Sequence, residues 1–117
     1  MSKGWIGVDF DGTLAKTMDW RGHNSGDVGE PIWPMVERVK QWLRDGREVR
    51  IMTARVGENA HPKHLVAINT FCMEHFGTLL PVTCAKDFNM IELWDDRAVQ
   101  VEPNTGVPVG GSTRNLG

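Results

Sequence analysis

The sequence has few of the features that mark several classes of protein. Its only two cysteines, Cys72 and Cys84, lie in no CxxC or CxxH spacing, so we expect buried free thiols in a reducing cytoplasm. No apolar run approaches the length of a membrane span, and the N-terminus lacks a signal-peptide pattern, which predicts a cytoplasmic protein with no membrane partner. The formal net charge of −2 gives no overall attraction to nucleic acid or to a membrane surface.

The composition that remains is that of an ordinary globular protein. With 117 residues, 40% of them hydrophobic and 24% charged, the chain is long enough for one modest core. We therefore expect a single domain over residues 1–102. The stretch 103–117 is rich in Gly, Pro, Asn and Thr and has little to bury, which predicts a flexible C-terminal tail.

Hydrophobic patterning predicts strands and helices in alternation. Short apolar runs are typical of buried strands, whereas two longer segments carry apolar residues at helical spacing. The expected strands are 4–10, 48–53, 79–84 and 90–94, the expected helices are 31–45 and 62–75, and 98–101 is either an edge strand or the start of a short element. This order predicts a three-layer, Rossmann-like α/β domain with a mainly parallel sheet. The polar, Gly-rich segment 15–30 is long enough to form a lid loop over a site.

Two carboxylates stand where the first strand is expected to end, in the stretch "DFDGTL". If strand geometry persists, Asp9 and Asp11 lie on the same side of the backbone. One can attack a phosphorus atom and form an aspartyl-phosphate, while the other protonates the leaving oxygen and later activates water. Gly12 lets the chain turn, and its N–H group with that of Thr13 can receive an anion. Taken alone, the pair also fits a solvated turn with an N-capping aspartate.

Further polar side chains follow the other expected strands, and parallel strands bring their carboxyl ends to one edge of the sheet. Asp95 and Asp96 in "WDDRA" add carboxylate oxygens of the kind that Mg²⁺ binds. Thr53 offers a hydroxyl group and Lys86 a positive charge to the oxygens of a transferring phosphoryl group. The alternatives are an exposed acidic turn paired with Arg97, and a surface lysine near a helix start.

In their order along the chain, "DFDGTL", "IMT", Lys86 and "WDDRA" resemble the four motifs of the haloacid-dehalogenase-like (HAD) phosphatase superfamily. The resemblance covers about residues 4–101 and implies an HAD-like fold with Mg²⁺ dependence. It implies a phosphoaspartate at Asp9, with Asp11 as general acid and base and its backbone carbonyl on the metal. Thr13 resembles the threonine that packs this loop.

For the other motifs, the resemblance implies that Thr53 and Lys86 bind phosphate. It assigns the "DD" pair to the metal, with Asp96 as the direct ligand and Asp95 as its supporting neighbour. The segments on either side of Thr53 are too short for the helical cap that many members carry. We therefore expect a member without a large cap domain, in which only 15–30 covers the site.

A weaker likeness extends to small phage and bacterial phosphatases and to the phosphatase half of polynucleotide kinase/phosphatases. It suggests a nucleotide or a nucleic-acid phosphate end as substrate. A phosphatase of small metabolites such as sugar phosphates, a phosphotransferase, and a non-catalytic module that binds metal or phosphate remain alternatives, and the oligomeric state is open.

Four other residues each allow a functional and a purely structural interpretation. Arg55, in "TAR", either contacts substrate phosphate or forms a surface salt bridge. Trp20 can stack on a base, although a lone loop tryptophan more often folds back on its domain. His61 and His64 resemble a zinc pair without a third ligand, so we expect surface histidines.

Overall fold

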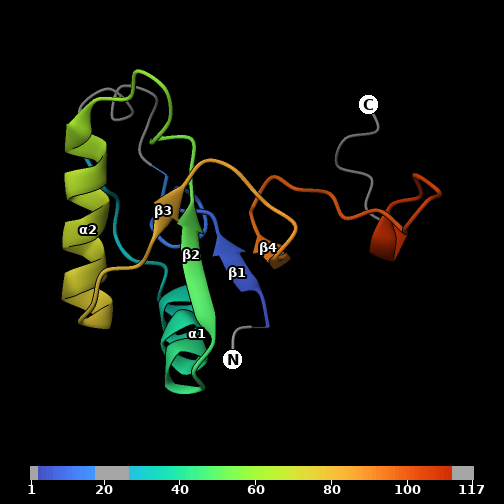
Figure 1. Ribbon diagram of the computed structural model, residues 1–117, viewed down its shortest axis with the longest axis horizontal. Helices are drawn as coiled ribbons and strands as arrows, with labels where there is room; N and C mark the ends of the chain where they lie inside the picture. Colours follow the sequence, from blue (N-terminus) through green and yellow to red (C-terminus); the bar gives the residue numbers. More distant parts are fainter. Residues whose placement is uncertain (1–2, 18–26, 112–117) are drawn as a thin grey trace.

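The computed structural model of the chain describes residues 3–17 and 27–111. Its four strands form one parallel sheet in the order β3-β2-β1-β4 (Figure 1). The strands are β1 (Trp5–Val8), β2 (Glu48–Met52), β3 (Val82–Thr83) and β4 (Met90–Trp94), and the helices are α1 (Trp33–Arg44) and α2 (Pro62–Phe76). The expected α/β class with a mainly parallel sheet is confirmed, without a large cap domain in the described ranges. None of the described helices is long and apolar enough to cross a membrane.

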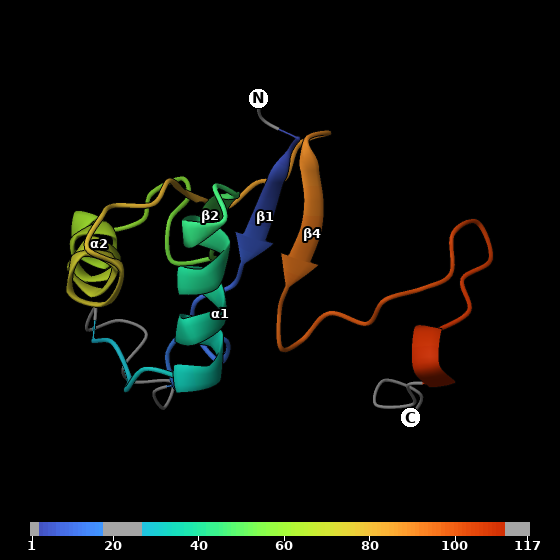
Figure 2. The same cartoon turned by 90° about the horizontal axis from the view of Figure 1, so that it is seen from below.

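The core lies between one face of the sheet and both helices. Ile6 and Val8 of β1 are paired with Val49 and Ile51 of β2, so these four fully or almost fully buried side chains share a face. They pack against Val36 and Val39 of α1 and against Ile68, Phe71 and Cys72 of α2. Figure 2 shows both helices on the same side of the sheet. This placement follows from two successive right-handed crossovers, β1 to β2 and β2 to β3, that run in one direction.

The opposite face of the sheet is crossed by the connection from β3 to β4. Because these strands lie at opposite edges of the sheet, residues 84–89 pass over β2 and β1. Trp5 is buried beneath this segment, and its Nε1 donates a hydrogen bond to Asp87 at 2.8 Å. The guanidinium of Arg50 stacks on the same indole at 4.5 Å. An extended segment, not a helix, is therefore the covering layer on this side.

The helix ends follow local chemistry. Pro62 stands in the first turn of α2, where its missing N–H costs nothing, and His61 caps the helix by accepting a hydrogen bond from the Lys63 N–H at 3.0 Å. The helix ends at Gly77, whose φ of 71° is the left-handed conformation typical of such ends. The predicted helix over 62–75 is therefore correct to within one residue.

The strands were predicted less accurately than the helices. The run 79–84 was expected as a strand, but β3 has only two residues, and Cys84 beyond it is exposed. The expectation of two buried thiols is therefore wrong for Cys84 and correct for Cys72. In the segment 98–101, Val101 forms only an isolated antiparallel bridge with Pro108.

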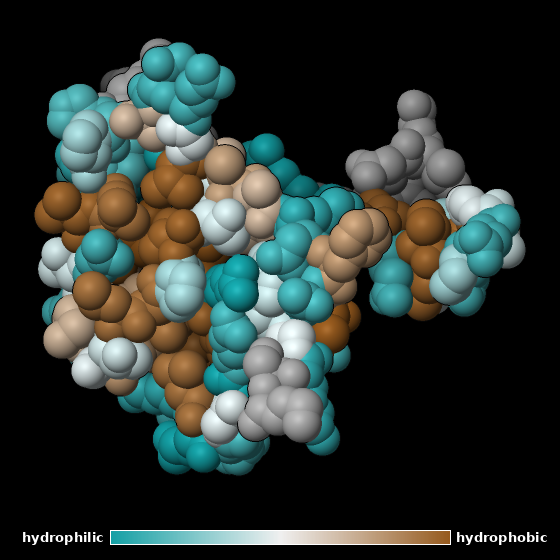
Figure 3. Space-filling model, in the orientation of Figure 1, coloured by the Kyte–Doolittle hydropathy of each residue, from teal (hydrophilic) through white to brown (hydrophobic). Residues whose placement is uncertain are grey.

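Beyond β4 the chain runs away from the sheet (Figure 1). Residues 101–108 fold back on themselves, with hydrogen bonds from Glu102 N–H to the Val107 carbonyl at 2.7 Å and from Val109 N–H to the Gln100 carbonyl at 2.8 Å, and end in a short 3-10 turn. On the main body, hydrophobic side chains gather over α2 (Figure 3), where Val66, Met73 and Leu79 are exposed.

Candidate functional site

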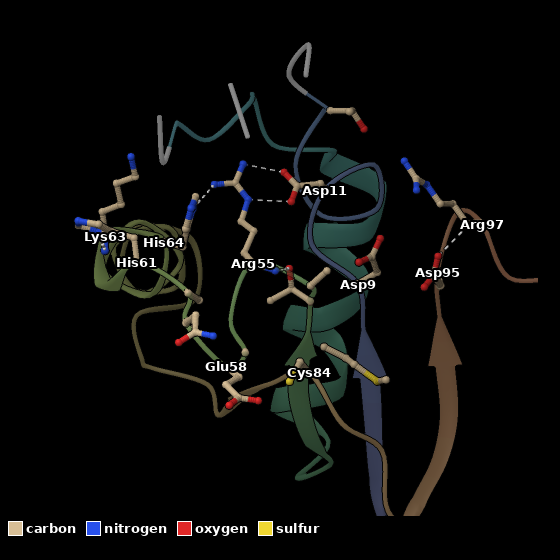
Figure 4. A pocket seen from close by; sticks show the side chains of 17 residues that line it. Asp9, Asp11, Arg55, Glu58, His61, Lys63, His64, Cys84, Asp95 and Arg97 are labelled. Atoms are coloured by element: carbon tan, nitrogen blue, oxygen red, sulfur yellow. Dashed lines mark hydrogen bonds and ion pairs between the residues drawn. The ribbon is translucent and has the colours of Figure 1, made fainter. Parts of the chain in front are cut away.

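A pocket of about 880 Å³ opens at the carboxyl ends of the strands. Most of the site residues predicted from the sequence line it, namely Asp9, Asp11, Thr53, Arg55 and Asp95 (Figure 4). Asp9 directly follows β1, Thr53 follows β2, and Asp95 follows β4. Parallel pairing with Val8 opposite both Ile51 and Trp94 puts these strand ends at one level, which is why residues distant in sequence meet here.

Three carboxylates form the tightest cluster of the site. One oxygen from each of Asp9, Asp95 and Asp96 lies within 4.8 Å of the others. The buried Thr13 hydroxyl lies beneath them, 3.4 Å from Asp9 Oδ2 and 3.5 Å from Asp96 Oδ1. Three hard oxygen ligands at this spacing could hold a divalent cation. The Asp11 carboxylate is not part of this cluster.

Repulsion among these carboxylates is visible at Asp9. Burial, the charge of Asp95 and contact with Asp96, in that order of size, together raise the pKa of Asp9 from its ordinary value of 3.8 to about 7. Without a cation, the Asp9 carboxylate is therefore only partly ionised near neutral pH. A bound cation would offset the same repulsion and favour the ionised carboxylate.

Gly12 brings the turn after β1 against Asp96. Its φ is +87°, and a Cβ atom built there would lie 2.5 Å from Asp96 Oδ2. The N–H groups of Gly12 and Thr13 are donated within the turn, to the carbonyls of Ala15 at 2.7 Å and of Phe10 at 3.2 Å. Both N–H groups that were expected to bind an anion are therefore already hydrogen-bonded within the turn. What Gly12 contributes here is close approach to a carboxylate.

Asp11 is held by Arg55. Arg55 Nε donates to Asp11 Oδ2 at 2.8 Å and Nη2 donates to Oδ1 at 2.9 Å, so the pair is bidentate (Figure 4). The Arg55 side chain is only 6% exposed. Of the two expected roles of Arg55, the salt bridge is present but is buried and made to Asp11, whereas a contact with substrate phosphate stays a prediction. Arg55 is thus paired with Asp11, the residue expected to act as general acid and base.

Thr53 and Lys86, both predicted to bind phosphate, end in different surroundings. Thr53 is buried, lines the pocket, and its hydroxyl accepts a hydrogen bond from the Arg55 N–H at 3.1 Å. Lys86 is exposed on the segment that leaves β3, and the described wall of the pocket does not include it. Because β3 ends at Thr83, Lys86 belongs to the crossing segment and not to a strand end.

His64 is a buried residue of the pocket wall that was not expected from the sequence. The expectation of a surface histidine is wrong for His64, which is 9% exposed and whose Nδ1 lies 3.3 Å from Arg55 Nη1. A signal was present in the sequence, because His64 falls on the helical stripe that continues through Ile68 to Cys72. His61 is exposed at the start of the helix, as expected. Trp20 lies outside the described residues.

Comparison with known proteins supports the fold alone. No protein family model matches the chain, and no curated protein matches it. Among solved structures, it is similar to a conserved protein of Bacteroides thetaiotaomicron with a TM-score of 0.60 and 22% sequence identity. That similarity covers 84% of this chain and 79% of the other. At this level of identity, the shared property is the architecture.

Proposed function

We propose that this protein is a Mg²⁺-dependent phosphomonoesterase that works through an aspartyl-phosphate on Asp9. The observation that carries the proposal is the meeting of the Asp9, Asp95 and Asp96 carboxylates within 4.8 Å, with Asp9 and Asp95 lining one pocket together with Asp11 and Thr53. The order and spacing of the motifs that contribute these residues, which resemble those of the HAD-like phosphatases, supports it as well.

The donor set fits Mg²⁺ better than it fits softer metals. It consists of three carboxylate oxygens, fewer than the coordination number of Mg²⁺, so water and a phosphate oxygen would complete the shell of a bound ion. Asp9, Asp95 and Asp96 would hold the ion. When bound, Mg²⁺ neutralises charge on the phosphoryl group and on the carboxylates around it.

The steps then follow from the side chains. An Asp9 carboxylate oxygen attacks phosphorus, forming an O–P bond while the bond to the leaving oxygen breaks, and Asp11 donates a proton to that oxygen. Water next gives its proton to Asp11 and attacks phosphorus, which frees phosphate and restores the Asp9 carboxylate. The Thr53 hydroxyl lies at the pocket wall, where it can donate to a non-bridging phosphoryl oxygen.

Hydrolysis of p-nitrophenyl phosphate with and without Mg²⁺ tests this proposal. We expect Asp9→Asn to lower kcat by at least about a thousandfold, because the nucleophile is lost. EDTA should abolish turnover and added Mg²⁺ should restore it. Asp45→Asn is the matched control, since Asp45 is an exposed carboxylate at the end of α1. Turnover of Asp9→Asn at the wild-type rate would refute the mechanism.

The substrate class can be narrowed with a panel of phosphomonoesters. The pocket is far larger than a phosphate ion, and Lys63 and Arg97 line it, which favours an anionic substrate with a sizeable leaving group. We propose a nucleotide or the phosphate end of an oligonucleotide. Higher kcat/KM for 3′-phosphorylated oligonucleotides or mononucleotides than for sugar phosphates would support this, and the reverse order would favour a small-metabolite phosphatase. Product analysis in labelled water separates hydrolysis from phosphoryl transfer.

A further inference from the structure

Arg55 is the most heavily bonded side chain in the described part of the pocket. Besides its two hydrogen bonds to the Asp11 carboxylate, its Nη2 donates to the Asp27 backbone carbonyl at 2.6 Å. Its Nη1 lies 3.3 Å from His64 Nδ1, and its guanidinium lies over the Phe10 ring at 5.9 Å. These partners come from the turn after β1, from the residues before α1, and from α2.

The contact with His64 has a defined direction. Arg55 has donors only, so the Nδ1 of His64 must be the acceptor, which requires the neutral ring with its proton on Nε2. Burial lowers the pKa of His64, and the positive charge of Arg55 lowers it further, which agrees with a neutral ring. His64 therefore orients Arg55 as a hydrogen-bond acceptor and does not repel it as a cation.

The arrangement limits how Arg55 can act. A planar guanidinium with partners on three sides cannot rotate without breaking several hydrogen bonds at once. The bidentate pair fixes the plane of the Asp11 carboxylate, whereas each Asp11 oxygen keeps a second lone pair for a proton. Asp11 itself lies beyond the end of β1, where its backbone forms only an isolated bridge with Ala15.

We propose that Arg55 is a positioning residue, which orients Asp11 for proton transfer to the leaving oxygen and is itself held by His64 and the Asp27 carbonyl. The proposal rests on the proposed phosphatase function. It differs from the expectation that Arg55 binds substrate phosphate. A phosphate-binding arginine stabilises every phosphoryl transfer equally, whereas a residue that orients the acid matters only when the leaving oxygen needs a proton.

Two substrates with different leaving groups separate these roles. The 4-nitrophenolate of p-nitrophenyl phosphate leaves without protonation, whereas the alkoxide of an alkyl phosphate needs a proton. In Arg55→Lys, which keeps the charge and loses the planar fork, we expect the aryl-to-alkyl ratio of kcat/KM to rise at least about tenfold. Asp11→Asn should raise the same ratio. Arg44→Lys, which alters an exposed arginine at the end of α1 that does not line the described pocket, should leave the ratio at its wild-type value.

An unchanged ratio in Arg55→Lys would overturn the proposal, and if both substrates lose activity by the same factor, it would favour a direct contact with the phosphoryl group. His64→Gln provides a second variant if Arg55→Lys does not fold, and its ratio should rise in the same direction by a smaller factor. The Asp9→Asn variant is measured in parallel. Its full activity would refute the phosphoaspartate mechanism, whereas an unchanged ratio in an Asp9-dependent enzyme refutes only the role of Arg55.

Discussion

At the scale of single residues, the charge of Asp9 depends on what occupies the site. Its pKa in the folded chain is about 7, above the unfolded value of 3.8, so the folded state binds more protons between these values. Without divalent cations, stability should therefore fall as pH rises from about 4 to about 7. The loss is on the order of 2 kcal/mol after allowance for solvent screening.

Urea denaturation at pH 5 and pH 7.5, in EDTA, measures this effect. Asp9→Asn should remove the largest part of the pH dependence, because an amide does not ionise. Mg²⁺ should stabilise the wild type more at pH 7.5 than at pH 5. A wild type whose stability is the same at both pH values in EDTA would contradict the burial and repulsion at Asp9.

At Gly12, two separate features disfavour any residue with a Cβ atom: the positive φ and the nearby Asp96 carboxylate. Gly12→Ala places a Cβ atom in left-handed backbone and against the Asp96 carboxylate, whereas Gly46→Ala has a similar φ of +78° with nothing within 4 Å. We expect Gly46→Ala to cost about 1 kcal/mol of stability from backbone strain alone. Gly12→Ala should cost more and should also weaken Mg²⁺ binding, measured by titration calorimetry. Equal effects of both substitutions would show that contact with Asp96 does not matter.

At the scale of elements, the crossing segment 84–89 takes the place of a helix, and a hydrogen bond from the buried Trp5 indole holds it. Asp87→Ala leaves the buried Trp5 indole N–H without its acceptor, so the urea midpoint should fall. Trp5→Phe removes the donor, so the same Asp87→Ala substitution should cost less in that background. A double-mutant cycle with no coupling would indicate that Arg50 and packing, not this hydrogen bond, hold the segment.

Both helices and the strands β1, β2 and β4 were predictable from their local pattern, whereas the extent of β3 was not. The helices over 33–44 and 62–76 and the strand over 90–94 were predicted closely, because apolar spacing and proline or glycine ends act locally. The run 79–84 was apolar enough for a strand but forms only two paired residues. Its partner β2 ends at Met52, which pairs with Thr83. After Thr83 the chain leaves β3 and crosses the sheet toward β4 at the opposite edge.

At the scale of the whole molecule, the parallel order of the strands brings together what the motifs separate. Asp9 and Asp95 are far apart in sequence, yet β1 and β4 are neighbours, and the Asp9 N–H donates to the Trp94 carbonyl at 2.9 Å. The sequence alone determined the α/β class, the strand-end position of the acidic residues and the short connections that leave no room for a large cap. The class and the strand ends follow from the spacing of hydrophobic residues, and the lack of room for a cap follows from the lengths of the connecting segments. Both can be read from neighbouring residues in the sequence.

Only the tertiary structure decided which of these side chains meet. It separated Asp11 from the other three carboxylates and paired it with Arg55, and it left Lys86 outside the described pocket wall. It also buried His64 against Arg55, where the sequence suggested a surface residue. Such pairings depend on distances across the fold between residues on different elements. A long side chain such as that of Arg55 can reach several partners, and only the packing of β1, α2 and the loop before α1 selects among them.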